Sequence, residues 1–290
     1  MKFFIADAFT DTLFGGNPAG VVILPEGADF PSDEICVKTA AELRYSETAF
    51  IKQTGPLEFN IRYFTPAAEV DLCGHATIAS FCCLAEAGVI PKTCTCINNT
   101  LAGTLNIDVK DGFVMMDMAT PQLISTIEDK DKLKELYEVM GASEDDMTDI
   151  LPQLVSTGLP DIMLPLKSKE VLDKIAPDMK KLSKLSEDYE VVGVHAYALA
   201  DEDGVTAYCR NFAPLYDIDE EAATGTSNGA LTYHFFLNDI IPGKAKCKMI
   251  QGEAMGRPSA ILSDLNADGD SCSIKVGGSA KILAEGNINL

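Results

Sequence analysis

Glu47 is the first residue whose type and setting suit acid–base chemistry. It belongs to the run Arg44-Tyr45-Ser46-Glu47-Thr48-Ala49-Phe50-Ile51, which predicts the start of a strand, and alternation places its side chain on the face of Tyr45 and Ala49. Such neighbours remove part of the water around a carboxylate, which favours its protonated form and suits it to proton transfer. An exposed glutamate without a chemical role explains the same pattern, so the residues alone leave both interpretations open.

His75 is the second candidate, at the expected start of a helix. A strand-like run over residues 57–64 precedes it, and a mostly apolar stretch over 78–89, typical of a buried helix, follows it. Gly74-His75-Ala76-Thr77 should therefore open that helix, where N–H groups and the helix dipole suit a carboxylate or phosphate ligand. The alternative is a glycine turn into a core helix, with His75 held only by hydrogen bonds.

A repeated motif strengthens the interpretation of this segment. Arg62-Tyr63-Phe64-Thr65-Pro66 has a counterpart in Arg210-Asn211-Phe212-Ala213-Pro214, about half the chain later. Gly74 and Ala79 follow the first copy, and Gly225 and Ala230 follow the second with the same spacing. A second helix is predicted from about Thr226 to Phe236. Repetition at this period predicts two similar halves, in which segments 57–90 and 205–237 superpose.

Acidic residues precede the second helix start. Glu220 and Glu221 stand in the run Asp217-Ile218-Asp219-Glu220-Glu221-Ala222-Ala223-Thr224-Gly225-Thr226. Carboxylates near a helix N-terminus are stabilised by the helix dipole alone, so a purely structural explanation is available for both.

Composition narrows the classes of partner. The 290 residues carry a net charge of −21, which argues against nucleic acid and anionic membranes as partners. Nine cysteines without a C-x-x-C motif fit reduced thiols in a cytoplasmic protein, and we expect no metal site. Residues 125–140 are predicted to be helical, and Gly277-Gly278 is predicted to kink the last strand.

Pieces along the whole chain resemble the PhzF-like family of phenazine biosynthesis isomerase-like proteins, which has the diaminopimelate epimerase type of fold. The matching pieces are Asp7-Ala8-Phe9, Gly16-Asn17-Pro18, Ser46-Glu47-Thr48, Phe64-Thr65-Pro66, Cys73-Gly74-His75, Arg210 with Phe212 and Pro214, Glu220 to Thr226, Gln251-Gly252, Gly256-Arg257-Pro258-Ser259, and Gly277-Gly278. The order of these pieces carries the resemblance, because no single one is specific.

The resemblance implies an α+β fold of two pseudo-symmetric domains, each a curved, mainly antiparallel sheet around a central helix. The domains would comprise residues 1–118 with 279–290, and residues 119–278, with the catalytic cleft between them. It also implies a homodimer that needs no cofactor and acts on a small-molecule carboxylate.

Roles carry over by position within the matched motifs. Glu47 matches the family's proton-shuttling glutamate, and His75 matches the histidine beside it. The resemblance implies substrate binding at Gly74, Thr224, Gly225 and Thr226. Glu221 stands where the family commonly has aspartate, which puts the phenazine precursor in doubt as the substrate. Related epimerases use two thiols, but only Cys73 occupies such a position, since Thr224 stands at the other.

These observations favour a cofactor-independent isomerase in which Glu47 moves a proton on a small amino-acid-like or cyclic carboxylic acid. Two alternatives stay open. One is an epimerase that uses Glu47 and Glu221 as a carboxylate pair. The other is a binding protein that has the fold without catalysis.

Overall fold

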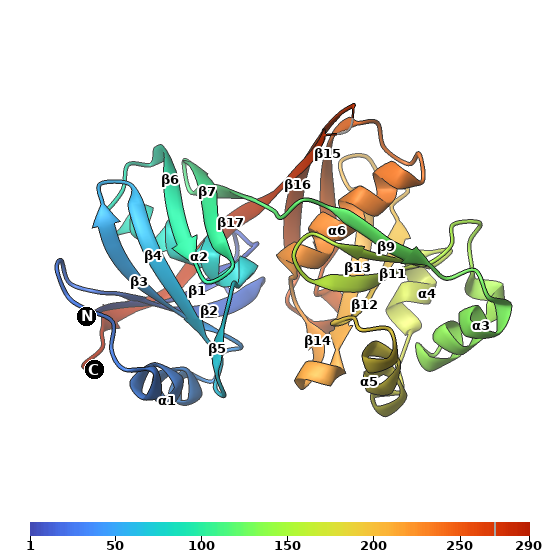
Figure 1. Ribbon diagram of the computed structural model, residues 1–290, viewed down its shortest axis with the longest axis horizontal. Coiled ribbons are helices and arrows are strands. Elements are labelled where there is room, and N and C mark those ends of the chain that lie inside the picture. The colour runs from blue at the N-terminus through green and yellow to red at the C-terminus, as the bar shows by residue number, and fades with distance from the viewer. Residues whose placement is uncertain (270) are drawn as a thin grey trace. The chain divides into compact units, whose positions relative to one another are not determined.

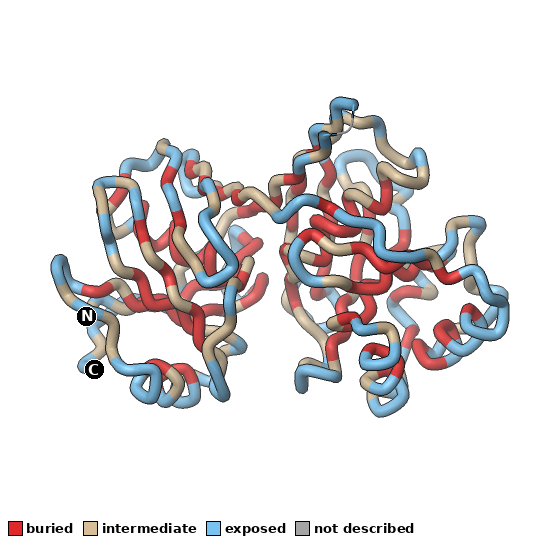
Figure 2. The backbone as a smooth tube through the Cα atoms, in the orientation of Figure 1, coloured by how far each residue is buried: buried red, intermediate tan, exposed pale blue. Residues whose placement is uncertain are grey.

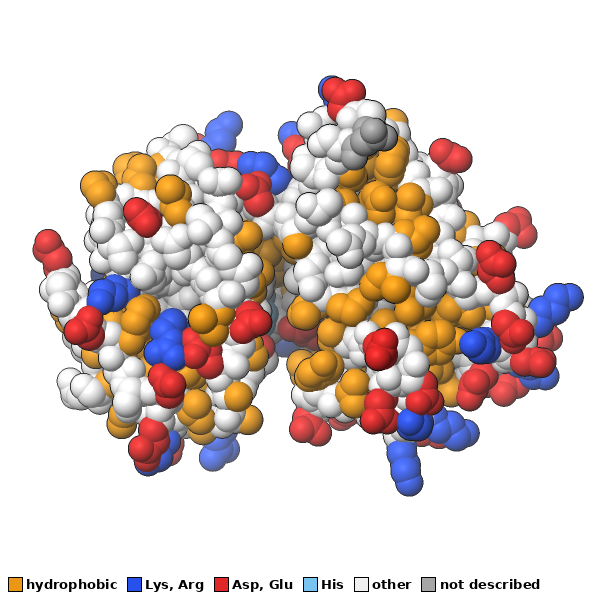
Figure 3. Space-filling view, in the orientation of Figure 1, with side chains coloured by type: hydrophobic (Ala, Val, Ile, Leu, Met, Phe, Trp, Pro, Cys, Tyr) orange, Lys and Arg blue, Asp and Glu red, His pale blue; other side chains and the backbone are white. Residues whose placement is uncertain are grey.

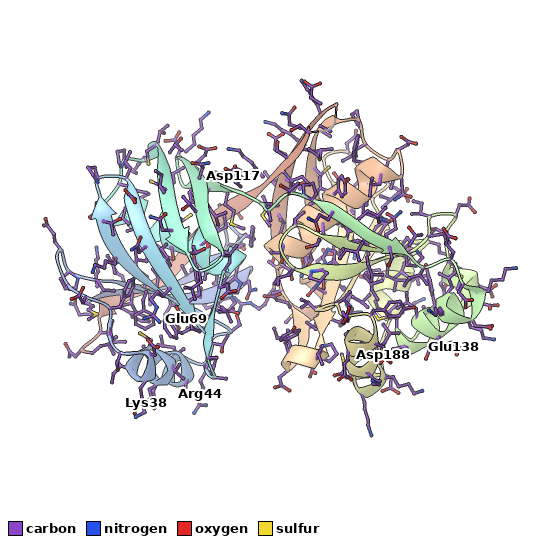
Figure 4. All side chains as sticks on the ribbon, in the orientation of Figure 1. Lys38, Arg44, Glu69, Asp117, Glu138 and Asp188 are labelled. Carbon is purple, nitrogen blue, oxygen red and sulfur yellow. The ribbon has the colours of Figure 1, made fainter. Side chains whose placement is uncertain are left out.

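The computed structural model describes residues 1–269 and 271–290, which form two compact units. The first unit comprises Met1–Asp117 together with Gly277–Leu290, and the second comprises Met118–Val276. Asp117, labelled in Figure 4, is the last residue of strand β8. The long strand β17 (Ser271–Asn287) runs from the second unit into the first.

The first unit is a sheet that closes on itself. Its elements are β1 (Lys2–Ala8), β2 (Asn17–Ile23), α1 (Asp33–Leu43), β3 (Thr48–Gly55), β4 (Glu58–Phe64), β5 (Glu69–Val70), α2 (Gly74–Glu86), β6 (Thr93–Thr100), β7 (Gly103–Lys110) and β8 (Phe113–Asp117). Pairing runs from β1 through β2, β3, β4, β6 and β7 to β8, and β17 pairs with both β8 and β1. The ring therefore has no open edge between β8 and β1.

Helix α2 fills the interior of this ring. It packs against β1, β2, β3, β7 and β8, as Figure 1 shows, and it is buried along nearly its whole length (Figure 2). A helix that is apolar all round needs such an enclosed position. Helix α1 instead covers the outer face, where Cys36 and Ala40 join a cluster with Phe50 and Phe64.

The second unit also combines strands with a central helix, and it contains more helices than the first. Its elements are β9 (Gln122–Thr126), α3 (Lys130–Val139), η1 (Glu144–Asp146), β10 (Gln153–Ser156), β11 (Pro160–Pro165), α4 (Lys169–Lys174), α5 (Met179–Asp188), β12 (Gly193–Leu199), β13 (Ala207–Ala213), η2 (Pro214–Tyr216), β14 (Ile218–Glu221), α6 (Gly225–Leu237), β15 (Lys244–Gln251), η3 (Glu253–Met255) and β16 (Ser259–Asp268). Helix α6 packs against β10, β11 and β16, whereas α4 and α5 pack against β12. Figure 3 shows many of the acidic side chains around α3 and α5.

The two units share one pattern of strand pairing. In the first, β2 is parallel to β3, β3 is antiparallel to β4, and β4 is antiparallel to β5 and parallel to β6. In the second, β11, β12, β13, β14 and β15 repeat these relations in the same order. The two predicted central helices are confirmed, since α2 begins at Gly74 and α6 at Gly225, each after the short strand of its unit.

The repeated R-x-F-x-P motif has a structural explanation. Each arginine lies over the ring of the phenylalanine two residues later, at 4.9 Å for Arg62 and 5.0 Å for Arg210. Each also binds a glutamate of the following short strand through two nitrogens: Glu69, labelled in Figure 4, for Arg62, and Glu220 for Arg210. The motif thus ties the strand before each central helix to its neighbour.

Two predictions about local structure are wrong. Residues 122–126 form strand β9 and the helix begins only at Lys130, because pairing with β10 outweighs local helix propensity in residues 125 and 126. Gly277-Gly278 does not interrupt β17. The glycine is needed at 277 because a Cβ there would lie 2.0 Å from the carbonyl oxygen of Val114. Within the described residues, no helix is long and apolar enough to cross a membrane.

Candidate active site

Glu47 lies immediately before β3 and not within it, so its predicted place on the strand is wrong. Helix α1 ends at Leu43, the following Arg44 turns the chain with a φ of 60°, and pairing with β2 starts only at Thr48. The Glu47 side chain is nevertheless only 14% exposed. Its Oε2 atom is buried and has no well-aligned hydrogen-bond donor among the described residues. A carboxylate oxygen in this state can accept a proton without first losing a strong partner.

His75 lies in the first turn of α2 and directly faces Glu47. Its Nε2 atom is 3.3 Å from Oε2 of Glu47 and 3.3 Å from Oγ of Ser46. Burial lowers the pKa of His75, and the neighbouring Glu47 partly opposes this effect. The imidazole is therefore neutral at neutral pH and acts toward Glu47 as a hydrogen-bonding group more than as a charge.

The other ring nitrogen of His75 faces Asn17 and Cys73. Nδ1 is 3.2 Å from Nδ2 of Asn17 and 3.3 Å from Sγ of Cys73. Asn17 reaches this position because Gly16 precedes it with a φ of 63° and lies against Ala8, where a Cβ would come within 2.2 Å of a carbonyl oxygen. Cys73 is the residue before α2 and is buried.

In the second unit, Thr224 and Glu221 form a separate polar group before α6. The Thr224 hydroxyl donates to Oε2 of Glu221 at 2.8 Å. Thr224 occupies the N-cap position but makes no side-chain bond to the helix, and Gly225 and Thr226 form its first turn. Glu220 pairs with Arg210, so of the two glutamates only Glu221 contacts the helix start through its side chain.

Gln251, at the end of β15, organises this turn. Its Oε1 atom accepts from the Thr224 N–H at 3.2 Å and from the Asn228 amide at 2.8 Å. Its Nε2 atom donates to the Glu221 carbonyl at 2.7 Å and to the Thr224 hydroxyl at 3.1 Å. The Thr224 hydroxyl thus accepts from Gln251 and donates to Glu221. Gln251 lies in one of the motifs that resemble the PhzF-like family, but that motif alone does not indicate its role.

A buried polar cluster beside α6 was not foreseen from the sequence. Ser227 donates to Asp161 and accepts from Asn211 at 3.2 Å, and Asn211 also contacts Nδ1 of His195 at 3.2 Å. Burial lowers the pKa of His195 to about 3. These residues come from β11, β12, β13 and α6, so no local sequence pattern predicts that they lie together.

Asp161 should make the stability of the protein depend on pH. Burial raises the pKa of its carboxyl to about 6, although Ser227 and the Gly193 N–H act in the opposite direction. The native state holds this proton more tightly than the unfolded state, so the stabilisation is complete below about pH 4 and is lost as pH rises to about 6. At about 1.4 kcal/mol per pKa unit, the loss is on the order of 3 kcal/mol.

Asp161→Asn should remove this dependence. Urea unfolding at pH 4 and pH 7 measures the change, with the exposed Asp201→Asn as the matched control. A variant whose stability changes between these pH values by the same amount as that of the wild type contradicts the assignment.

The structure thus groups the predicted site residues by unit. Glu47, Gly74 and His75 lie together at the start of α2, where they are joined by Asn17 and Ser46. Glu221, Thr224, Gly225 and Thr226 lie together at the start of α6. In each group a carboxylate stands beside the first turn of a buried helix, an arrangement suited to proton transfer on an anionic molecule.

Comparisons with known proteins identify relatives of this chain and of its fold. A protein of Clostridium acetobutylicum named an uncharacterized isomerase is 33% identical, over 98% of this chain and 96% of its own length. The crystal structure of a Bacillus anthracis phenazine biosynthesis protein of the PhzF family has a TM-score of 0.88 at 24% identity, covering 100% of this chain and 99% of that one. A hydroxyproline epimerase from Agrobacterium vitis has a TM-score of 0.64 at 12% identity, covering 99% and 90%.

The fold is therefore a sheet-rich α+β fold shared with isomerases and epimerases. The family model for phenazine biosynthesis-like proteins, PhzC-PhzF, matches residues 6–286. This chain belongs to that family.

Proposed function

We propose that this protein is a cofactor-independent isomerase that moves a proton within a small amino-acid-like or cyclic carboxylic acid. The observation that carries the proposal is the buried Oε2 atom of Glu47, which has no well-aligned donor and lies 3.3 Å from Nε2 of His75. The membership of a family with relatives named isomerases supports the class of reaction.

In the proposed reaction Glu47 acts first as base and then as acid. Its carboxylate removes a proton from a carbon next to a carboxyl or unsaturated group, and the electron pair of that C–H bond passes into the conjugated system. The protonated Glu47 then delivers the proton to another carbon of the same molecule, so no atom is gained or lost. His75 keeps its own proton throughout and lies beside Glu47, with Nε2 3.3 Å from Oε2.

The second unit is proposed to contribute Glu221 and the turn Thr224-Gly225-Thr226 to catalysis and carboxylate binding. The donation from Thr224 to Glu221 supports a carboxylate held in one orientation. Thr224 is not a thiol and its hydroxyl is already engaged, which argues against a two-thiol racemase. We further propose that the two units derive from one ancestral unit, as the shared strand pairing supports, and that the protein is a homodimer.

The test of this function is exchange of substrate hydrogens with solvent. The protein is incubated in D₂O with a panel of small amino acids and cyclic carboxylic acids, and each is examined by mass spectrometry. We expect at least one to gain deuterium at carbon at a rate proportional to protein concentration. Binding of carboxylates without any such exchange would support the non-catalytic alternative instead.

We also expect the purified protein to hold no stoichiometric zinc or iron. Glu47, Cys73 and His75 each place a donor atom within 4.8 Å of the others. Metal binding there would require Cys73 to lose its proton in a buried setting and His75 to turn a lone pair toward the ion. Elemental analysis of protein purified without chelator measures this. One equivalent of metal that is lost in Cys73→Ser, or in Cys94→Ser at the Cys94–Cys96 pair, would contradict the prediction.

A further inference from the structure

We propose that Asn17 is a positioning residue that holds His75 in the tautomer with its proton on Nε2, the ring atom on the side of Glu47 and Ser46. This inference rests on the proposed function for its meaning, since it concerns how the general base is oriented. The test of this inference is independent of the proposed function, because the position of a ring proton is measured without a substrate.

The contacts of His75 fix where its proton lies. A neutral imidazole carries one N–H, and its other nitrogen accepts. Nε2 lies 3.3 Å from Oε2 of Glu47, which only accepts as a carboxylate, and 3.3 Å from Oγ of Ser46, which is able to accept as well. A lone pair on Nε2 would face that anion in a poorly solvated site, so the proton belongs on Nε2. Nδ1 must then accept.

Asn17 supplies a donor to Nδ1. Its amide nitrogen lies 3.2 Å from that atom, and Asn17 is 4% exposed, so water does not readily replace it. Sγ of Cys73 lies 3.3 Å from the same nitrogen. Asn17 therefore supplies the donor that leaves the His75 proton on Nε2.

His195 provides a matched case in the second unit. The amide nitrogen of Asn211 lies 3.2 Å from its Nδ1, the same distance as in the Asn17–His75 pair. Asn211 also donates to Ser227, whose own proton goes to Asp161, which identifies the Asn211 atom beside His195 as the amide nitrogen. The same reasoning thus assigns the Nε2–H tautomer to His195.

His234 provides the opposite case. Asn238 uses its two amide hydrogens on the backbone carbonyl of His234 at 2.8 Å and on Oε1 of Gln153 at 3.1 Å, which identifies that Gln153 atom as an acceptor. It then has no hydrogen for Nδ1 of His234, although its nitrogen lies 3.3 Å away. Oε1 of Gln153 lies 2.6 Å from Nδ1 of His234, so this histidine carries its proton on Nδ1. The Tyr197 hydroxyl donates to Nε2 at 2.8 Å. Of the three histidines of the chain, His75 and His195 should therefore carry the proton on Nε2, and His234 should carry it on Nδ1.

Long-range ¹H–¹⁵N correlation spectra of the ¹⁵N-histidine-labelled full chain at pH 7.5 test the proposal. Replacing each histidine by glutamine assigns the three rings. In the wild type, His75 and His195 should show Nε2–H, and His234 should show Nδ1–H. Asn17→Asp replaces the donor by an acceptor, so His75 should gain a proton on Nδ1 while the signals of the other two rings stay unchanged.

The matched control is Asn211→Asp, which should alter His195 and leave His75 as in the wild type. A wild-type His75 that carries its proton on Nδ1, or a His75 spectrum unchanged by Asn17→Asp, overturns the proposal. If the Asn17 variant does not fold, the wild-type spectrum alone decides. A wild type with the expected tautomer but without deuterium exchange would count against the isomerase function and not against the role of Asn17.

Discussion

Glu47→Gln is expected to reduce deuterium incorporation into the substrate by about 10²- to 10⁴-fold, the range that a positioned acid–base group contributes. Glutamine keeps the shape and the hydrogen-bonding capacity of glutamate but cannot take up the proton. The measurement is mass spectrometry of the exchanging compound in D₂O, at equal concentrations of variant and wild type. Because the substituted atom is not a carboxylate-binding group, binding of small carboxylates to the protein should change little.

Glu42→Gln serves as the control, since Glu42 is an exposed residue of α1 close to Glu47 in the sequence. It should exchange deuterium as the wild type does. Full exchange in Glu47→Gln would remove Glu47 as the base and make Glu221 the leading candidate. A comparison of Glu221→Gln with both proteins would then decide between the two carboxylates.

Arg210→Met is expected to lower the free energy of unfolding of the second unit by about 3–5 kcal/mol, as removal of one partner of a buried ion pair does. The guanidinium holds both carboxylate oxygens of Glu220 at 2.8 Å, and the two side chains are only 12% and 15% exposed. It also donates to the carbonyls of Leu172 and Ile175 at 3.1 and 2.8 Å. All these acceptors lose their partner together in the variant. Urea unfolding followed by far-ultraviolet circular dichroism measures the loss.

Two further variants isolate the cause of that loss. Arg210→Met combined with Glu220→Gln should recover part of it, because the uncompensated negative charge is gone. Lys184→Met removes an exposed cation that binds Glu187 and Asp188, and should cost less than about 1 kcal/mol. A loss below 1 kcal/mol for Arg210→Met would show that the repeated arginine does not hold its strands together.

Local patterns were sufficient to predict the two central helices. Each begins at a glycine and continues as an apolar run, and the R-x-F-x-P motif before each is explained by contacts within a few residues of the strand pair. The contact between Glu47 and His75 depends on neighbouring elements of one unit, whereas the residues alone left a purely structural role open for each.

Longer-range contacts were not predictable in this way. The segment with Gly16 and Asn17 is a glycine-rich run typical of a loop, yet Asn17 begins β2 because pairing with β1 continues to its end. Asp161 and His195 come from separate strands, and each is an isolated polar residue in an apolar run. Only the folded arrangement shows that they share hydrogen bonds with Ser227 and Asn211.

The continuity of β17 also sets an order of assembly during synthesis. The second unit is complete once Val276 has left the ribosome, whereas the first still lacks the strand that joins β8 to β1. Domains usually fold as they emerge, the N-terminal one first, but here the N-terminal unit must wait for the last residues of the chain. Until then β1 and β8 each have an unpaired edge, which is able to pair with a strand of another chain and so favours aggregation. A ribosome that released the chain a few residues early would leave the part it made first unfinished.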